Sequence, residues 1–194
     1  MKSCDKRNLL VILFIVLSTN LGCQKKGGLA PFFDELYFKY KDIVSSGSSS
    51  ERIYRIKELH DGYEVIEKDL SPILPRTEKH IVDLWGFIKQ STRIRETSQK
   101  TKKHYKHKGK RICIWIPAEE LQVGNKFETS LGNCQVEEKR SWENRDVWVL
   151  KGDLGVEFYY DIKTGFLVGS HVPSLPMVGS TKRILIETNA DISY

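Results

Sequence analysis

The stretch VEFYYDIKTGFLV, residues 156–168, decides the fold class, because it has the pattern of a tight β-hairpin. Val156–Tyr160 and Phe166–Val168 are rich in aromatic and branched residues, which favour a pleated strand. Asp161 opens the intervening turn and Gly165 closes it, in keeping with the usual residues of turns. We therefore predict two antiparallel strands here, and an antiparallel sheet around them.

Further strands are predicted on both sides of this hairpin. Arg111–Ile116 is the strongest, because branched apolar residues fit a pleated surface and Pro117 would end the strand. Turn signals recur at short intervals without intervening helices, which predicts a meander of roughly seven strands. The other predicted strands are 62–66, 134–139, 146–150, 183–187 and, more weakly, 84–88, with a connection at 70–76.

The start of the globular part predicts two helices. Apolar residues recur at three- and four-residue spacing over 29–44, and Pro31 suits the first helical turn. Ile53, Ile56 and Leu59 share one face of a second, shorter helix. The predicted fold class is therefore α+β, with N-terminal helices packed on an antiparallel sheet.

The first residues predict export. A basic head at residues 2–7 precedes the apolar run Leu9–Leu17, which is the pattern of a secretory signal. A membrane-spanning anchor is the alternative, but it needs about 20 apolar residues, and this run ends at the polar Ser18–Asn20. We expect residues 1–22 to be a signal peptide and the protein to be exported, anchored on the periplasmic or extracellular face of a membrane.

The exit from this segment, Leu21-Gly22-Cys23, resembles a bacterial lipobox, in which a lipid is attached to the cysteine. The resemblance implies lipidation of Cys23. The polar residues after it suit a short tether, residues 23–30, and the length of the remaining chain, 31–194, is that of a single domain. The alternative is ordinary cleavage, which would release a soluble protein.

The remaining cysteines form a candidate pair. Cys4 lies in the predicted signal peptide, which leaves Cys113 and Cys134 in a compartment where disulfides persist. A bridge between them would stabilise the fold by about 3 kcal/mol in the chain-entropy model. Two buried free thiols are the alternative.

The net charge of +6 is mild, but basic residues are concentrated in one stretch, residues 100–111. Its residues could contact anionic head groups, each contributing about 1 kcal/mol near the surface; the alternative is a solvated hairpin loop. The candidate contact residues are Lys100, Lys102, Lys103, Lys106, Lys108, Lys110 and Arg111. We predict no nucleic-acid partner, because an exported protein seldom meets one.

No catalytic, metal or cofactor site is predicted. The sequence holds no Gly-rich phosphate loop, nucleophile elbow or zinc-ligand spacing. His104 and His107 are a weak metal pair, since lysines surround them. We therefore expect a non-enzymatic protein.

The order of the segments carries a family resemblance. Asp34–Leu36, Ile53–Lys57 and Gly62-Tyr63 at the start, with Trp148–Lys151 and Phe158–Val168 near the end, resemble LolA-like lipoprotein carriers. The resemblance implies a curved, open half-barrel with an apolar concavity that holds acyl chains or another hydrophobic ligand. The function expected is that of a membrane-tethered envelope lipoprotein that binds a hydrophobic ligand as carrier or sensor. The alternative is a protein–protein interaction module of the cell envelope, with a protein partner.

Overall fold

The computed structural model describes residues 35–72, 75–94, 102–104, 107–175 and 179–192. These residues form one twelve-stranded sheet in which neighbouring strands are antiparallel. Two 3-10 turns, η1 (Ala118–Glu120) and η2 (Asp153–Gly155), are the only helical elements in the described part. In that same part, no helix is long and apolar enough to cross a membrane.

The strands are β1 (Glu35–Val44), β2 (Ser49–Leu59), β3 (Gly62–Asp69), β4 (Arg76–Val82), β5 (Ile88–Ile94), β6 (Lys102–His104), β7 (Lys126–Thr129), β8 (Gly132–Trp142), β9 (Arg145–Gly152), β10 (Glu157–Asp161), β11 (Leu167–Leu175) and β12 (Gly179–Thr188).

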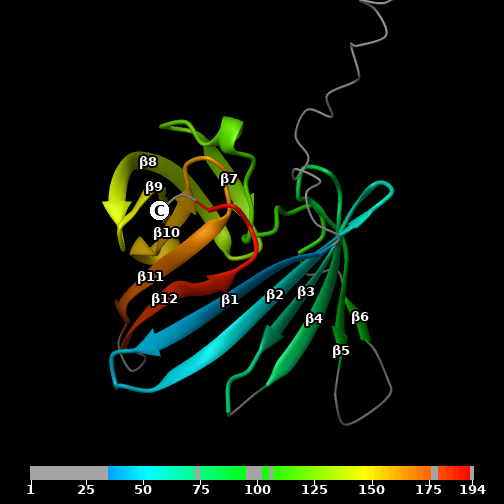
Figure 1. Ribbon diagram of the computed structural model, residues 1–194, viewed down its shortest axis with the longest axis horizontal. Coiled ribbons are helices and arrows are strands. Elements are labelled where there is room, and N and C mark those ends of the chain that lie inside the picture. The colour runs from blue at the N-terminus through cyan, green and yellow to red at the C-terminus, as the bar shows by residue number, and fades with distance from the viewer. Residues whose placement is uncertain (1–34, 73–74, 95–101, 105–106, 176–178, 193–194) are drawn as a thin grey trace, which may run out of the picture.

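The sheet consists of two meanders of six strands each. Its order is β6-β5-β4-β3-β2-β1-β12-β11-β10-β9-β8-β7, so the first and the last strand pair at its centre. Figure 1 shows β1–β5 as a broad twisted wall and β8–β11 curling over beside it. Bulges, such as that between Val136 and Glu138 in β8, increase the local bend. The strands pair antiparallel, as predicted, but the sheet is larger than expected and no helix packs on it in the described residues.

The two predicted N-terminal helices are wrong. Residues 35–44 and 49–59 form β1 and β2, joined by a turn in which Gly47 has φ +87°. In β1 the buried residues Leu36, Phe38 and Tyr40 alternate with less buried ones, which is the two-residue period of a strand. Apolar residues four positions apart fit the period of a helix and also the two-residue period of a strand. The aromatic content of this segment favours the strand.

The number and positions of the other strands are partly as predicted. The stretches 62–66, 134–139, 146–150 and 183–187 lie in β3, β8, β9 and β12, and the hairpin of 156–168 forms β10 and β11. The predicted strand at 84–88 is mostly the turn that separates β4 from β5. Twelve strands replace the expected seven, so the fold class is all-β rather than α+β.

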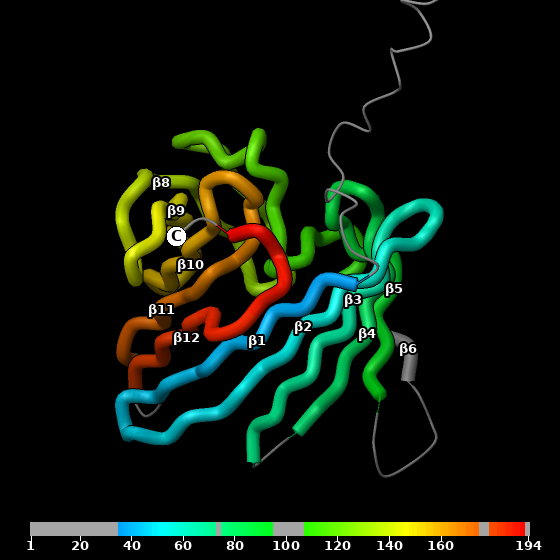
Figure 2. The backbone as a smooth tube through the Cα atoms, in the orientation of Figure 1, coloured from blue at the N-terminus to red at the C-terminus, as the bar shows by residue number. Residues whose placement is uncertain are grey.

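Arg111–Ile116, predicted as the strongest strand, belongs to no strand of the sheet. It lies in the connection from β6 to β7 and makes only isolated bridges, of which one joins Trp115 to Phe166. Ile112, Ile114 and Ile116 are almost completely buried. Figure 2 shows the described part of this connection between the two halves of the sheet. The segment therefore fills the place that a covering helix was expected to take, and we call residues 111–116 the plug.

Arg111 also connects the turn before β5 with β7, which lie near opposite edges of the sheet. Its backbone bridges Phe87 on one side and Thr129 of β7 on the other. Its guanidinium lies 4.8 Å from the ring centre of Phe87 and 5.4 Å from that of Phe127, and it forms a 3.1 Å ion pair with Glu120. Arg111 is therefore a structural residue that holds the curved sheet together at this level.

Candidate functional site

The side chains on the inner face of the sheet change character along each central strand. In β1 the buried Tyr40 is followed by Asp42, and in β2 the buried Tyr54 is preceded by Arg52. The register pairs Tyr40 with Arg52 and Asp42 with Arg183, so the change falls at a similar level on neighbouring strands. One end of the inner face is thus apolar and covered by the plug, and the other end is charged. The charged residues are Asp42, Arg52, Glu67, Asp69, Arg76, Glu78, Arg93 and Arg183.

Asp42 and Arg183 form the innermost ion pair. Arg183 donates from Nε and from Nη2 to the two oxygens of Asp42, at 2.6 and 2.9 Å. Burial alone would raise the pKa of Asp42, but the hydrogen bonds and charges of Arg183 and Arg52 outweigh burial and lower it. Burial likewise opposes the charge of Arg183, yet Asp42 raises the pKa of that guanidinium. Each side chain keeps the other ionised in a largely buried place.

Arg52 extends the network to the next strand. It hydrogen-bonds Glu67, donates to Asp69 at 2.7 Å and lies 3.5 Å from Asp42. Its Nε is buried without a hydrogen-bond partner among the described residues. Arg76 approaches Glu67 only to 3.8 Å, which is an ion pair and not a hydrogen bond.

Glu78 is the centre of a second group on β4 and β5. Arg93 donates to its Oε1 from Nε and Nη2, at 3.2 and 2.9 Å. His80 Nε2 lies 3.8 Å from Oε2, and His80 Nδ1 is 2.8 Å from the hydroxyl of Ser91. Burial would raise the pKa of Glu78, but Arg93, Arg76 and His80 together lower it. The carboxylate therefore stays charged at neutral pH.

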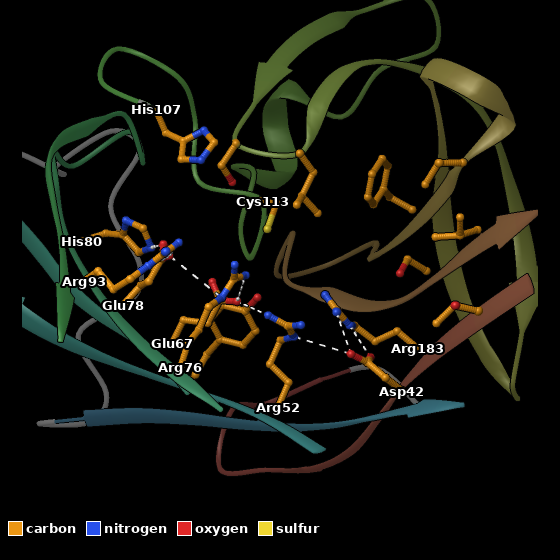
Figure 3. A pocket seen from close by; sticks show the side chains of 18 residues that line it. Asp42, Arg52, Glu67, Arg76, Glu78, His80, Arg93, His107, Cys113 and Arg183 are labelled. Atoms are coloured by element: carbon orange, nitrogen blue, oxygen red, sulfur yellow. Dashed lines mark hydrogen bonds and ion pairs between the residues drawn. The ribbon is translucent and has the colours of Figure 1, made fainter. Parts of the chain in front are cut away.

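A cavity of about 600 Å³ lies over this charged floor (Figure 3). Four arginines and three carboxylates line it, together with His80 and His107. The rest of its lining includes an apolar wall of Leu131, Val156, Phe158 and Val172, together with the hydroxyl residues Ser130, Ser170 and Thr181. The concavity expected to be wholly apolar is therefore amphipathic, because the plug occupies the apolar end and leaves the charged end open.

The two predicted disulfide cysteines are buried free thiols in the structure. Cys113 lines the cavity (Figure 3). Burial raises the pKa of Cys113, and burial with the neighbouring Cys113 and Asp153 raises the pKa of Cys134 to about 12. Both thiols are therefore protonated at neutral pH and poor nucleophiles. Their pairing stays a prediction.

The structure distributes the basic stretch over different environments. Arg111 is buried, and Lys110 forms a 2.9 Å ion pair with Glu128, whereas Lys108 is exposed. Lys102 and Lys103 belong to β6, and the placement of their side chains is not described; Lys100 and Lys106 lie outside the described residues, as does the lipidation candidate Cys23. Arg111 is thus unavailable to an anionic surface, and for the other residues the contact stays a prediction.

Within the part of the chain that the structure describes, no three His, Cys, Asp or Glu side chains are grouped so that they could hold a metal ion.

The sequence analysis missed the charged floor entirely. Arg76, Glu78 and His80 alternate with other residues in β4, and such polar alternation is usually typical of a solvent-exposed face. The signal that could have found the site is that Arg52 and Glu67 adjoin aromatic and branched residues at two-residue spacing on the same face.

On lowering the pH, we expect the protein to lose stability through Asp42 and Glu78. Their pKa values in the folded protein lie below the ordinary 3.8 and 4.5, so the unfolded chain takes up protons first as the pH falls. The stabilisation is complete above the ordinary values and is lost as the pH falls through the lower, folded-state values. Urea unfolding at about pH 7, 4 and 3 measures this loss.

The matched control is Asp42→Asn, which removes the carboxyl group of Asp42 and keeps that of Glu78. The free energy of unfolding of this variant should fall less steeply over the same pH range. Equal slopes for the two proteins would contradict the assignment to Asp42.

Comparison with known proteins gives little beyond this geometry. No family model matches the chain, and no curated protein is significantly similar to it. Among solved structures, a LolA superfamily protein from Nitrosomonas europaea is similar to it at a TM-score of 0.32 and 7% sequence identity. The similarity covers 79% of this chain and 84% of that one. A TM-score of this size does not establish a shared fold, so the function proposed below rests on the residues of the site.

Proposed function

We propose that this chain is an exported, non-enzymatic protein that binds a hydrophobic ligand in the cavity of its inner face. The observation that carries the proposal is a cavity of about 600 Å³ with an apolar wall of Leu131, Val156, Phe158 and Val172. Pockets that bind small ligands usually measure about 300–1,000 Å³ and combine apolar walls with a few polar groups.

The plug supports the same proposal, because it fills the apolar core by itself and the core does not need the space of the cavity. Ile112, Ile114 and Ile116 already fill the apolar end of the inner face, and Tyr160 donates from its hydroxyl to the backbone carbonyl of Cys113 at 2.7 Å. The fold thus has a complete core without the cavity. The open space beside Cys113 is then available to a ligand.

The chemistry of the floor favours binding over catalysis. Asp42, Glu67 and Glu78 are each bonded to an arginine, so none is a free general base at neutral pH. The raised pKa of Cys113 keeps its thiol protonated. We therefore propose a carrier or sensor.

The proposed location follows from the first residues of the sequence. The basic head and apolar run of residues 2–17 support export, and Cys23 supports a lipid tether to a membrane. A tethered binding domain would act close to a source of hydrophobic ligands.

Native mass spectrometry of residues 24–194, exported by bacteria and purified without detergent, tests the proposal. We expect a ligand-bound mass and an apolar molecule in the organic extract. Val172→Trp, which fills the apolar wall, should weaken binding about tenfold, corresponding to about 1.4 kcal/mol of binding free energy.

The matched control is Ile186→Trp, because Ile186 is 48% exposed and does not line the cavity. Binding by this variant should equal that of the unchanged protein. A bare polypeptide mass together with no binding of added fatty acids or alcohols would overturn the proposal and favour a protein–protein interaction module.

A further inference from the structure

The four arginines of the cavity differ in how many of their hydrogen-bond donors are already bonded. Arg183 is held by both oxygens of Asp42, and Arg52 donates to Glu67 and to Asp69. Both side chains are about 14% exposed or less. These two guanidinium groups are therefore bonded mainly to the protein itself.

Arg93 lies nearer to the solvent but is also bonded. Its Nε and Nη2 both donate to Oε1 of Glu78. One edge of its guanidinium is therefore occupied, although the side chain is 47% exposed.

Arg76 is different. Its nearest carboxylate oxygens are those of Glu67 at 3.8 Å and Glu78 at 3.9 Å, both beyond hydrogen-bond distance. The side chain lines the cavity and is 43% exposed (Figure 3). Within the described residues, Arg76 is thus the arginine of the cavity that forms no hydrogen bond to a carboxylate, so its donors are the most available to a ligand.

The acids beside Arg76 are neutralised by other arginines. Arg52 binds Glu67, and Arg93 binds Glu78. The lining holds four guanidinium groups and three carboxylates, and Asp69, which is bonded to Arg52 but does not line the cavity, brings the whole network to four groups of each sign. An anion at Arg76 would therefore meet a guanidinium that forms no hydrogen bond to a carboxylate of the floor, beside acids that are bonded to other arginines.

We propose that the ligand is an amphiphile with an acidic head, and that Arg76 binds this head while the apolar wall takes the chain. A planar guanidinium matches a carboxylate or a phosphate with two parallel hydrogen bonds. Arg76 lines the cavity from one half of the sheet, and Val172 and Phe158 line the same cavity from the other half, so a molecule that fills the cavity contacts both. This inference rests on the proposed function and adds the chemical class of the ligand.

Binding of matched amphiphiles tests the inference. Dodecanoic acid and dodecyl phosphate are compared with dodecanol by isothermal titration, on the intact exported protein. We expect at least one of the two acids to bind about tenfold more tightly than the alcohol. Hydrogen bonds between charged groups strengthen binding by about this factor. The preference between the two acids then distinguishes a carboxylate head from a phosphate head.

Arg76→Gln should abolish this preference and leave the affinity for dodecanol unchanged, whereas Arg76→Lys should retain part of it. The control is Arg55→Gln, because Arg55 is 52% exposed and alternation along β2 places it on the face opposite to Arg52. It should keep the full preference.

The outcomes separate the two proposals. Equal binding of the acids and the alcohol, or an acid preference that persists in Arg76→Gln, would overturn the acidic-head inference and leave the cavity as a hydrophobic site. Absence of binding by all three compounds would overturn the proposed function itself.

Discussion

Arg183→Ala is expected to lower the free energy of unfolding by about 3–5 kcal/mol, because it leaves the carboxylate of Asp42 buried without its main partner. Asp42 is 8% exposed and accepts two hydrogen bonds from Arg183. Arg52, 3.5 Å away, is committed to Glu67 and Asp69 and cannot replace them fully. Urea unfolding at neutral pH measures the change.

Two further variants separate this effect from a general loss of arginine. Adding Asp42→Ala to Arg183→Ala should recover part of the lost stability, since no unpaired charge remains. Arg55→Ala removes an exposed ion pair with Glu35 and should change the free energy of unfolding by about 1 kcal/mol or less. A cost for Arg183→Ala as small as that of Arg55→Ala would show that the pair contributes little.

Trp115→Ala should have an effect of similar size, about 3–5 kcal/mol, because it removes the largest side chain of the plug. Trp115 is 4% exposed and packs edge-on against Tyr63, with ring centres 6.2 Å apart. It also lies against Gly86, where a Cβ atom would be 3.2 Å from the indole ring. The close packing leaves little room for collapse into the resulting cavity.

The same substitution at Trp85 is the control. Trp85 is 41% exposed in the turn before β5, so Trp85→Ala should cost about 1 kcal/mol or less. Thermal or urea unfolding of both variants gives the comparison. Similar losses at the two tryptophans would argue that the plug is not part of the cooperative core.

The hairpin of 156–168 could be predicted because its signals are local. Asp161 Oδ1 accepts hydrogen bonds from the backbone of Lys163 and Thr164 and from the Thr164 hydroxyl, and Gly165 takes φ +72°. These contacts span at most three residues along the chain. Residue types at fixed positions therefore determine them almost alone.

The N-terminal strands could not be recognised with the same certainty, because their apolar residues fit two periods. Leu36, Tyr40 and Val44 satisfy the four-residue spacing of a helix and also the alternation of a strand. Pairing with β12 at the centre of the sheet decides between them. That partner lies at the other end of the sequence.

The plug and the charged floor depend on tertiary context. Ile112–Ile116 has the composition of a strand but lies between the halves of a sheet that is already complete. Asp42 and Arg183 are 141 positions apart, so no local pattern marks them as partners. The spacing of Arg52 and Glu67 beside apolar residues could mark the face on which the site lies, but the pairing of its charged residues could not be predicted from the sequence.

The pairing of β1 with β12 has a consequence for the order of folding. Each meander can form from contacts between neighbours along the chain, but the two join only when residues 179–188 meet residues 35–44. Contacts this distant slow folding, because a long loop must close before they stabilise anything. During synthesis, the edge of β1 in the first meander therefore stays unpaired until the last strand emerges. A chaperone that covers this edge would protect the growing chain from the intermolecular strand pairing that exposed edges invite.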